Sequence, residues 1–180
     1  LRTIVFAEAD LKSQPVMALS MNALVRAGEA RGGFVEADGA GWVFARHLAP
    51  TAVVERDFVA VAERFVGSPY LWGGRESAGI DCSGLVQAAL AACGVGCPRD
   101  SDMQARELGE VVPGGESLEG LKRGDLVFWT GHVGGVLEGG RLLHANAWHM
   151  ATEIEPLAEA AARIAEVAGP VKVVRRLLFA

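Results

Sequence analysis

Hydrophobic and polar residues alternate over short stretches at the beginning of the chain. These stretches occupy residues 23–30, 33–37 and 42–44, and an Asp-Gly-Ala-Gly turn signal precedes the last of them. Short strands joined by turns predict a small all-β unit in the form of a barrel, although fifty residues provide only a thin core. We therefore expect one domain over residues 1–50 and a second over residues 51–180.

Further along the chain, the spacing of apolar residues changes to that of helices. Four residues are suited to helix starts, three as caps and a proline in the first turn: Asp57, Asp81, Ser101 and Pro156. The four predicted helices extend to Gly67, about Cys93, Gly109 and about Val167, respectively. Each helix has an apolar side that must be covered by other elements.

Strand patterns occur between the third and fourth predicted helices and again after the fourth helix. Apolar runs at 126–129 and 132–137 precede a Glu-Gly-Gly turn, and a further strand is expected at 141–145. A last strand is expected over 171–179, because Gly-Pro ends the helix before it. Helices followed by antiparallel strands indicate an α+β fold.

The composition is that of a folded protein and excludes several classes of partner. Of the 180 residues, 51% are hydrophobic, and the mean hydropathy of +0.25 indicates enough apolar material for a core. The 17 basic and 22 acidic residues give a formal net charge of −5, so we expect neither nucleic-acid binding nor attachment to a membrane surface. The longest uncharged run, 82–98, predicts a buried helix and a turn rather than a membrane span.

The three cysteines and four histidines show no metal-binding spacing. CxxC and HxxxH patterns are both missing, so we expect no metal site. Cys93 and Cys97 are close enough in sequence for a disulfide, but two reduced thiols beside a chain reversal are the favoured alternative. Sparing use of cysteine and the lack of a leader favour a cytoplasmic protein. A secreted or periplasmic protein stays open, because the chain begins with Leu1 rather than Met.

Cys82 lies in an Asp81-Cys82-Ser83-Gly84 sequence at the start of a predicted helix. A helix N-terminus offers unpaired N–H groups and a partial positive charge, and both lower the pKa of a thiol. We expect Gly84 to leave room on the exposed side of this first turn. The alternative is that Cys82 is a small buried residue, as most free cysteines are.

His132 and His144 are candidates for the base that a nucleophilic cysteine needs. They are 12 residues apart with a turn between them, so they lie on neighbouring antiparallel strands and can form an imidazole–imidazole hydrogen bond. Glycines on both sides of His132 are expected to allow close approach of a substrate. Cys82 with two paired histidines predicts nucleophilic catalysis. His47 and His149 have no such setting and are interpreted as surface or structural residues.

Six short motifs follow one another between residues 57 and 150. They are Tyr70-Leu71-Trp72-Gly73-Gly74, Asp81-Cys82-Ser83-Gly84-Leu85-Val86, Pro98-Arg99-Asp100-Ser101 with Gln104, Gly124-Asp125-Leu126-Val127-Phe128-Trp129, Gly131-His132-Val133-Gly134 and Leu143-His144-Ala145. In this order they resemble the motifs of the NlpC-type cysteine peptidases, papain-like enzymes that cut cell-wall peptides. The resemblance implies papain-like helices and an antiparallel sheet.

The first fifty residues resemble, mainly through the Gly-Ala-Gly-Trp-Val stretch at 39–43, the bacterial SH3-like module that often precedes this catalytic domain. This resemblance implies a small SH3-like barrel. In the peptide-recycling subgroup, groups of that module wall off the pocket for the substrate amine. Glu36 and Trp42 are the candidates for such groups here.

The resemblance implies roles for the matching catalytic residues. Cys82 matches the nucleophile, and His132 matches the general base that later protonates the leaving amine. His144 matches the third polar residue, which orients the base. Tyr70 matches a tyrosine beside the cysteine, whose hydroxyl can help to bind the oxyanion.

Substrate-binding roles are implied as well. Asp81 and Ser101 match residues that hold a free substrate amine. Ser83, in the motif of Asp81, and Trp72, in the motif of Tyr70, are further substrate-binding candidates. Arg99 is suited to a substrate carboxylate, which it would bind with both ends of its guanidinium. The alternative for Arg99 is an ion pair with a neighbouring aspartate, either Asp100 or Asp102. Trp148 either lines the cleft or packs in the core.

The resemblance therefore implies a cysteine endopeptidase that hydrolyses the γ-D-glutamyl–diamino-acid bond of peptidoglycan stem peptides, with no cofactor. The expected partner is a peptidoglycan-derived peptide with a free N-terminal amine. One alternative is an amidase or acyltransferase that uses the same thiol. Another is a catalytically idle protein that binds the cell wall.

Overall fold

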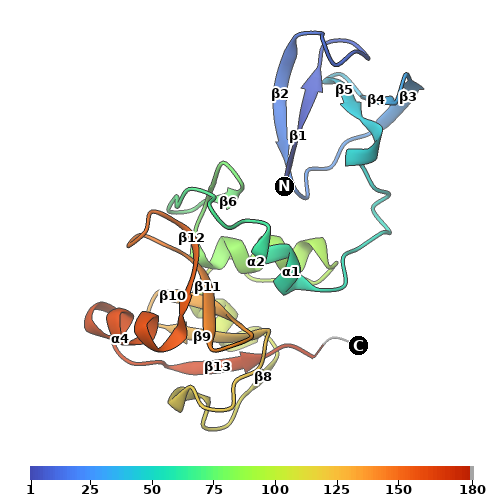
Figure 1. The fold of residues 1–180 in the computed structure, drawn as a ribbon. Coiled ribbons are helices and arrows are strands. Elements are labelled where there is room, and N and C mark those ends of the chain that lie inside the picture. The colour runs from blue at the N-terminus through green and yellow to red at the C-terminus, as the bar shows by residue number, and fades with distance from the viewer. Residues whose placement is uncertain (179–180) are drawn as a thin grey trace. The chain divides into compact units, whose positions relative to one another are not determined.

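The structure is a computed structural model that describes residues 1–178, and it divides into two compact units (Figure 1). The first unit is Leu1–Val54, and the second begins at Glu55. Each unit has its own antiparallel sheet. Within residues 1–178, no helix combines the length and the apolar content that crossing a bilayer requires.

The first unit contains five strands and a short 3₁₀ helix. They are β1 (Arg2–Phe6), β2 (Pro15–Ser20), β3 (Ala27–Arg31), β4 (Phe34–Ala37), β5 (Gly41–Phe44) and η1 (Ala45–His47). The strand order is β2-β1-β5-β4-β3, so β2 and β3 are the two edges of one sheet. The all-β character is as expected, but the run predicted at 23–30 is shifted to β3.

The expected barrel is not confirmed, because no closed barrel is found among the described strands. The fully buried hydrophobic core of this sheet consists of Val5, Ala37 and Val43. Every residue of β3 is exposed, and so are the first four residues of β2. Edge strands that bury so little surface cannot drive closure of the sheet. The likeness to an SH3-like module stays a prediction.

The second unit combines four helices with a six-stranded sheet. Its elements are α1 (Phe58–Glu63), β6 (Arg75–Glu76), β7 (Gly79–Ile80), α2 (Cys82–Ala92), α3 (Ser101–Glu107), β8 (Glu110–Val111), η2 (Gly115–Ser117), β9 (Asp125–Trp129), β10 (His132–Leu137), β11 (Arg141–Asn146), β12 (Ala151–Pro156), α4 (Leu157–Ala168) and β13 (Val173–Arg176). The sheet order is β12-β11-β10-β9-β13-β8, and its neighbouring strands are antiparallel. The predicted mixture of helices and an antiparallel sheet is therefore confirmed.

Helices cover both faces of this sheet. Leu142 packs in a cluster with Leu157 and Ile164 of α4. Leu143, the next residue on β11, lies with Leu85 of α2. Because successive residues of a strand point to opposite faces, α2 and α4 lie on opposite sides of the sheet, and Figure 1 shows α4 beside β12 and β11.

Several predicted boundaries differ from those of the structure. Asp100, not Ser101, is the residue before α3, and it makes no capping hydrogen bond through its side chain. β12 was not expected, because its alternating glutamates do not give an apolar strand pattern. The last predicted strand is shorter, at Val173–Arg176, and its predicted end at Phe179 lies outside the described residues.

Candidate active site

Cys82 is the first residue of α2, and Asp81 caps this helix. The Asp81 Oδ1 accepts a hydrogen bond of 2.7 Å from the backbone N–H of Gly84. Cys82 is 7% exposed, and the backbone N–H of Val133 donates to its sulfur. The thiol is therefore in contact with the start of β10, one residue from His132.

The backbone N–H groups at the helix start lower the pKa of the thiol, as expected, but burial outweighs them and the net shift is upward. Burial raises the pKa of Cys82, and the charge of Asp81 raises it further, while the backbone N–H groups of Val133 and Ser83 oppose this effect only in part. Cys82 is therefore a neutral thiol in the resting protein. It must lose its proton to a base before it can act as a nucleophile.

Gly84 is buried rather than on the exposed side of the helix, so that expectation is wrong. A Cβ atom at this position would lie 2.2 Å from the carbonyl oxygen of Gly74 and 2.9 Å from Oδ1 of Asp81. The glycine lets the loop before β6 pack directly on the first turn of α2. It thereby fixes the backbone around Cys82.

His132 and His144 form the pair that the sequence predicted. The Nε2 of His132 lies 2.7 Å from Nδ1 of His144. His132 is the first residue of β10, and His144 lies in the middle of β11. Gly134 makes room for the pair, since a Cβ there would lie 3.2 Å from Cβ of His144 and 2.7 Å from a methyl group of Leu142. This glycine therefore serves side-chain packing, whereas Gly131 lines the open cleft.

Both imidazoles are held in the neutral form. Burial lowers the pKa of His132 to about 3, and the nearby His144 and Arg163 contribute to the same shift. Burial also lowers the pKa of His144, although Glu155 opposes that change. A neutral His132 is in the protonation state that a general base requires.

The structure extends the histidine pair through Glu155 and Arg163, which the sequence reasoning missed. Oε1 of Glu155 lies 2.6 Å from Nε2 of His144. Arg163 of α4 binds both oxygens of this carboxylate, at 2.8 and 2.5 Å. Burial would raise the pKa of Glu155, but the hydrogen bonds from Arg163 and His144 lower it to about 2. The carboxylate is therefore ionised at neutral pH.

Two residues near this extension had open interpretations. Trp148 is 71% exposed, and its ring lies 5.2 Å from the guanidinium carbon of Arg163, so it does not pack in the core. His149 is bound to Asn146 through both its backbone N–H and its Nδ1. This arrangement agrees with a structural interpretation of His149.

A cleft of about 370 Å³ opens in front of Cys82. The cleft collects seven of the predicted site residues, namely Tyr70, Trp72, Asp81, Cys82, Ser83, Arg99 and Ser101. Asp100, Asp102 and Gly131 lie along it as well. Gly131 of this lining directly precedes His132, and the backbone N–H of Val133, the residue after His132, donates to the sulfur of Cys82.

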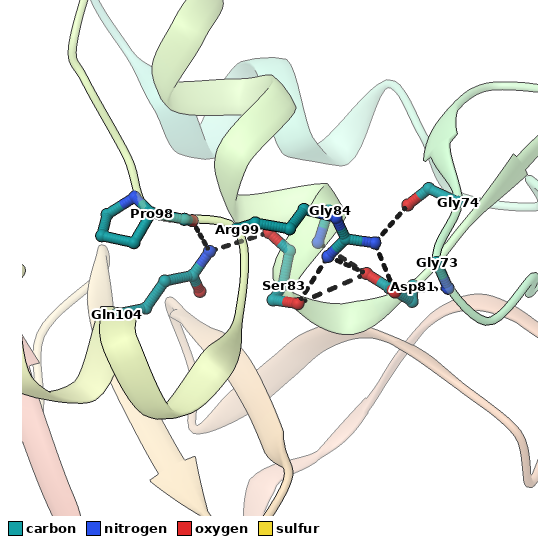
Figure 2. Close-up of polar contacts among 8 residues, drawn as sticks. All are labelled: Gly73, Gly74, Asp81, Ser83, Gly84, Pro98, Arg99 and Gln104. Atoms are coloured by element: carbon teal, nitrogen blue, oxygen red, sulfur yellow. Dashed lines mark hydrogen bonds and ion pairs between the residues drawn. The ribbon is translucent and has the colours of Figure 1, made fainter.

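Arg99 forms an ion pair with an aspartate, which was one of its two alternatives, but the partner is Asp81 and the expected Asp100 or Asp102 is wrong. Its two terminal nitrogens bind the two Asp81 oxygens at 3.0 and 2.6 Å. They also donate to Oγ of Ser83 and to the carbonyl of Gly74, as Figure 2 shows. The guanidinium is occupied within the protein, and a substrate carboxylate would have to compete for it.

Gln104 holds the same region from the other side (Figure 2). It is fully buried, and its amide nitrogen donates to the carbonyls of Ser83 and Pro98, each at 2.9 Å. It therefore ties the first turn of α2 to the segment that carries Arg99.

The remaining candidates belong to the first unit. Glu36 and Trp42 are cross-strand neighbours in the first unit, and their predicted role in an amine pocket stays untested. His47 is bound there to Thr3 at 2.8 Å. Within residues 1–178, no group of three or more metal-binding side chains is found.

Comparison with known proteins identifies relatives of this site. The sequence model of the NlpC/P60 family matches residues 67–164. The γ-D-glutamyl-L-lysine dipeptidyl-peptidase of Bacillus subtilis (strain 168) is 37% identical over 111 residues, which are 57% of this chain and 36% of that protein. The chain therefore spans about a third of this relative's length.

Solved structures share the fold. An NlpC/P60 family protein from Bacillus cereus has a TM-score of 0.74 at 20% identity, covering 99% of this chain and 64% of that one. The peptidoglycan hydrolase RipB from Mycobacterium tuberculosis has a TM-score of 0.50 at 26% identity, covering 74% of each chain.

Proposed function

The chain belongs to the NlpC/P60 family, and on this premise we propose that it is a cysteine peptidase of peptidoglycan stem peptides. The proposed scissile bond joins the γ-carboxyl of D-glutamate to the amine of a diamino acid. The name of the Bacillus subtilis relative supports this choice of bond. The name of the Mycobacterium tuberculosis neighbour, a peptidoglycan hydrolase, supports the cell-wall substrate.

The proposal depends mainly on one observation, that Cys82 lines an open cleft and is hydrogen-bonded by the residue that follows His132. The thiol lines the cleft and touches the backbone of Val133. The neighbouring His132 has its Nε2 engaged by His144, so Nδ1 is the ring nitrogen left to accept a proton. These contacts support assigning Cys82 as the nucleophile, His132 as the base and His144 as the orienting group of an acyl transfer.

Acylation begins when Sγ of Cys82 attacks the γ-carbonyl carbon and its proton passes to Nδ1 of His132. The carbonyl electrons move to oxygen, and we assign the hydroxyl of Tyr70 and the backbone N–H of Cys82, two residues that line the cleft, as the hydrogen-bond donors to this oxyanion. Burial raises the pKa of Tyr70, so this hydroxyl keeps its proton. When the tetrahedral intermediate collapses, the C–N bond breaks and His132 protonates the leaving amine.

Deacylation repeats these steps with water. His132 takes a proton from water while the hydroxyl oxygen attacks the thioester carbonyl. The C–S bond then breaks, and the imidazolium returns its proton to Cys82. The products are a carboxylic acid and an amine, and the enzyme is restored.

The walls of the cleft suit a peptide that ends in a free amine. Asp81, Asp100 and Asp102 place carboxylates along it, and Ser101 adds a hydroxyl. The Asp81 carboxylate is already bound by Arg99 and by the backbone N–H groups of Gly73 and Gly84. These bonds fix the position of the Asp81 carboxylate. The ammonium group of a substrate peptide would be stabilised by the negative charges of the three aspartates along the cleft.

The experiment is hydrolysis of free L-Ala-γ-D-Glu-diaminopimelate, with intact sacculi assayed in parallel. Cys82→Ala is expected to abolish cleavage. Cys93→Ala is the matched control, because Cys93 is a free thiol at the opposite end of α2. The control is expected to retain full activity.

The outcomes separate the candidate functions. Cleavage of the tripeptide but not of sacculi would indicate a recycling enzyme, whereas cleavage of sacculi would indicate action on the wall. If the wild-type protein cuts neither substrate, the assigned bond is wrong. Cleavage by Cys82→Ala would refute the thiol mechanism.

A further inference from the structure

We propose that Glu155 is a positioning residue that fixes which nitrogen of each histidine carries the proton, so that His132 presents an unprotonated Nδ1 to the thiol. The consequence for catalysis rests on the proposed function. The tautomers themselves do not, because they are a property of the resting protein. The proposal follows from counting protons along one chain of hydrogen bonds.

The count starts at the carboxylate. An ionised carboxylate only accepts hydrogen bonds, so Nε2 of His144 must carry its proton to bind Glu155 at 2.6 Å. A neutral imidazole has one N–H group, and therefore Nδ1 of His144 is an acceptor. The Nε2 of His132, 2.7 Å away, must then be the donor. This leaves Nδ1 of His132 without a proton.

Arg163 ensures that Glu155 stays ionised and does not rotate. It binds both carboxylate oxygens, and the side chains of Arg163 and Glu155 are only 23% and 13% exposed. A two-point contact of this kind fixes the plane of the carboxylate. The ring of Trp148 covers the guanidinium and adds a cation–π contact.

The other charged groups around the pair are few. His149 lies 4.0 Å from Oε1 of Glu155, Glu153 is the cross-strand neighbour of His144, and Glu159 acts on Arg163 from α4. Asp81 and Tyr70 lie on the thiol side, near Cys82. Of these groups, Glu155 is the one hydrogen-bonded to the histidine pair.

The unprotonated Nδ1 of His132 matters for catalysis because the thiol of Cys82 is protonated. Since Cys82 is neutral at rest, the first step needs a base with a free lone pair. If His144 donated through Nδ1 instead, Nε2 of His132 would accept and its Nδ1 would carry the proton. That tautomer cannot remove the proton of Cys82.

The first test is ¹⁵N NMR of the histidine rings in the wild-type protein. We expect His132 to be protonated at Nε2 and His144 to be protonated at Nε2 as well. A proton on Nδ1 of either neutral ring would overturn the proposal. This measurement needs no substrate and no variant, so it stands even if the assigned bond is wrong.

The second test compares Glu155→Gln with Glu153→Gln, its control on the same strand. An amide can offer either an oxygen or an N–H group to His144, so the tautomers of Glu155→Gln should be mixed. We expect kcat/KM to fall about 10- to 100-fold and alkylation of Cys82 by iodoacetamide to slow in parallel. The control is expected to stay within twofold of the wild type.

A pH profile distinguishes positioning from a purely structural role. The negative charge of Glu155 raises the pKa of His132 and of His144 against the effect of burial. Glu155→Gln removes this charge, so the acidic limb of the plot of reaction rate against pH should move to lower pH. The limb can be followed through alkylation of Cys82 as well as through kcat/KM. An unchanged limb in a folded variant, or an unchanged rate, would overturn the proposal.

Discussion

Gly84→Ala is predicted to damage the site although it adds a single methyl group. The new Cβ would lie 2.2 Å from the backbone oxygen of Gly74, whereas real contacts of this kind stay above 3.0 Å. Backbone must move to relieve the clash, either in the loop that carries Gly74 or in the first turn of α2. Either movement displaces Cys82 or weakens the cap from Asp81.

The size of the effect follows from these distances. Overpacking against backbone costs about 1–3 kcal/mol, and a displacement of about 1 Å at a reacting group can cost about 100-fold in rate. Ala is otherwise about 1 kcal/mol better than Gly inside a helix. Helix propensity alone predicts that Gly84→Ala stabilises the protein, whereas the clash predicts that it destabilises it. The variant therefore distinguishes the two effects.

The assay has two parts, urea unfolding and the rate of Cys82 alkylation followed by mass spectrometry of its peptide. Gly96→Ala is the control, because no atom lies within 4 Å of a Cβ at this exposed position. It should be neutral or slightly stabilising. A Gly84→Ala protein as stable and as reactive as the wild type would refute the packing argument.

Three further predictions concern charge and packing. Arg99→Met should destabilise the protein by about 1–3 kcal/mol, because it leaves the Asp81 carboxylate with fewer partners. Thermal melting measures this loss, and the control Arg106→Met, whose ion pair is exposed, should melt like the wild type. Because the pKa of His132 is about 3 when folded and near 6.5 when unfolded, only the unfolded state binds its proton between these values. The free energy of unfolding should therefore fall below pH 6.5, by up to about 1.4 kcal/mol per pH unit for this group, and urea unfolding at pH 7 and pH 5 measures it. Gly134→Ala should separate the two imidazoles and reduce kcat/KM with little change in KM, which steady-state kinetics can check.

The parts of the site that follow local rules were predictable from the sequence. Asp81 marks the start of α2 because a side-chain oxygen there satisfies a free N–H group. His132 and His144 face each other because a tight hairpin fixes the register of two adjacent strands. In both cases a short stretch of sequence determines the geometry.

Glu155 and Arg163 could not be found in this way. β12 is a strand of alternating polar residues in which Thr152 alone is fully buried, so hydrophobic periodicity does not reveal it. Its partner Arg163 lies on the next helix, and no fixed spacing links a strand residue to a helix residue across a turn. The pairing depends on how α4 packs on the sheet, which is tertiary information.

The pairing of Arg99 illustrates the same limit and also explains the electrostatics of the thiol. The charge of Asp81 raises the pKa of Cys82, so an uncompensated Asp81 would oppose the thiolate that forms during attack. Arg99 lies on the same carboxylate and offsets that charge. On the sheet side, the charge of Glu155 favours the imidazolium that forms when His132 accepts the proton, whereas the charge of Arg163 opposes it. The two arginines therefore act in opposite ways on the ion pair that proton transfer from thiol to imidazole creates. Arg99 favours the thiolate because it offsets the charge of Asp81, whereas Arg163 keeps the Glu155 carboxylate in place and itself disfavours the imidazolium.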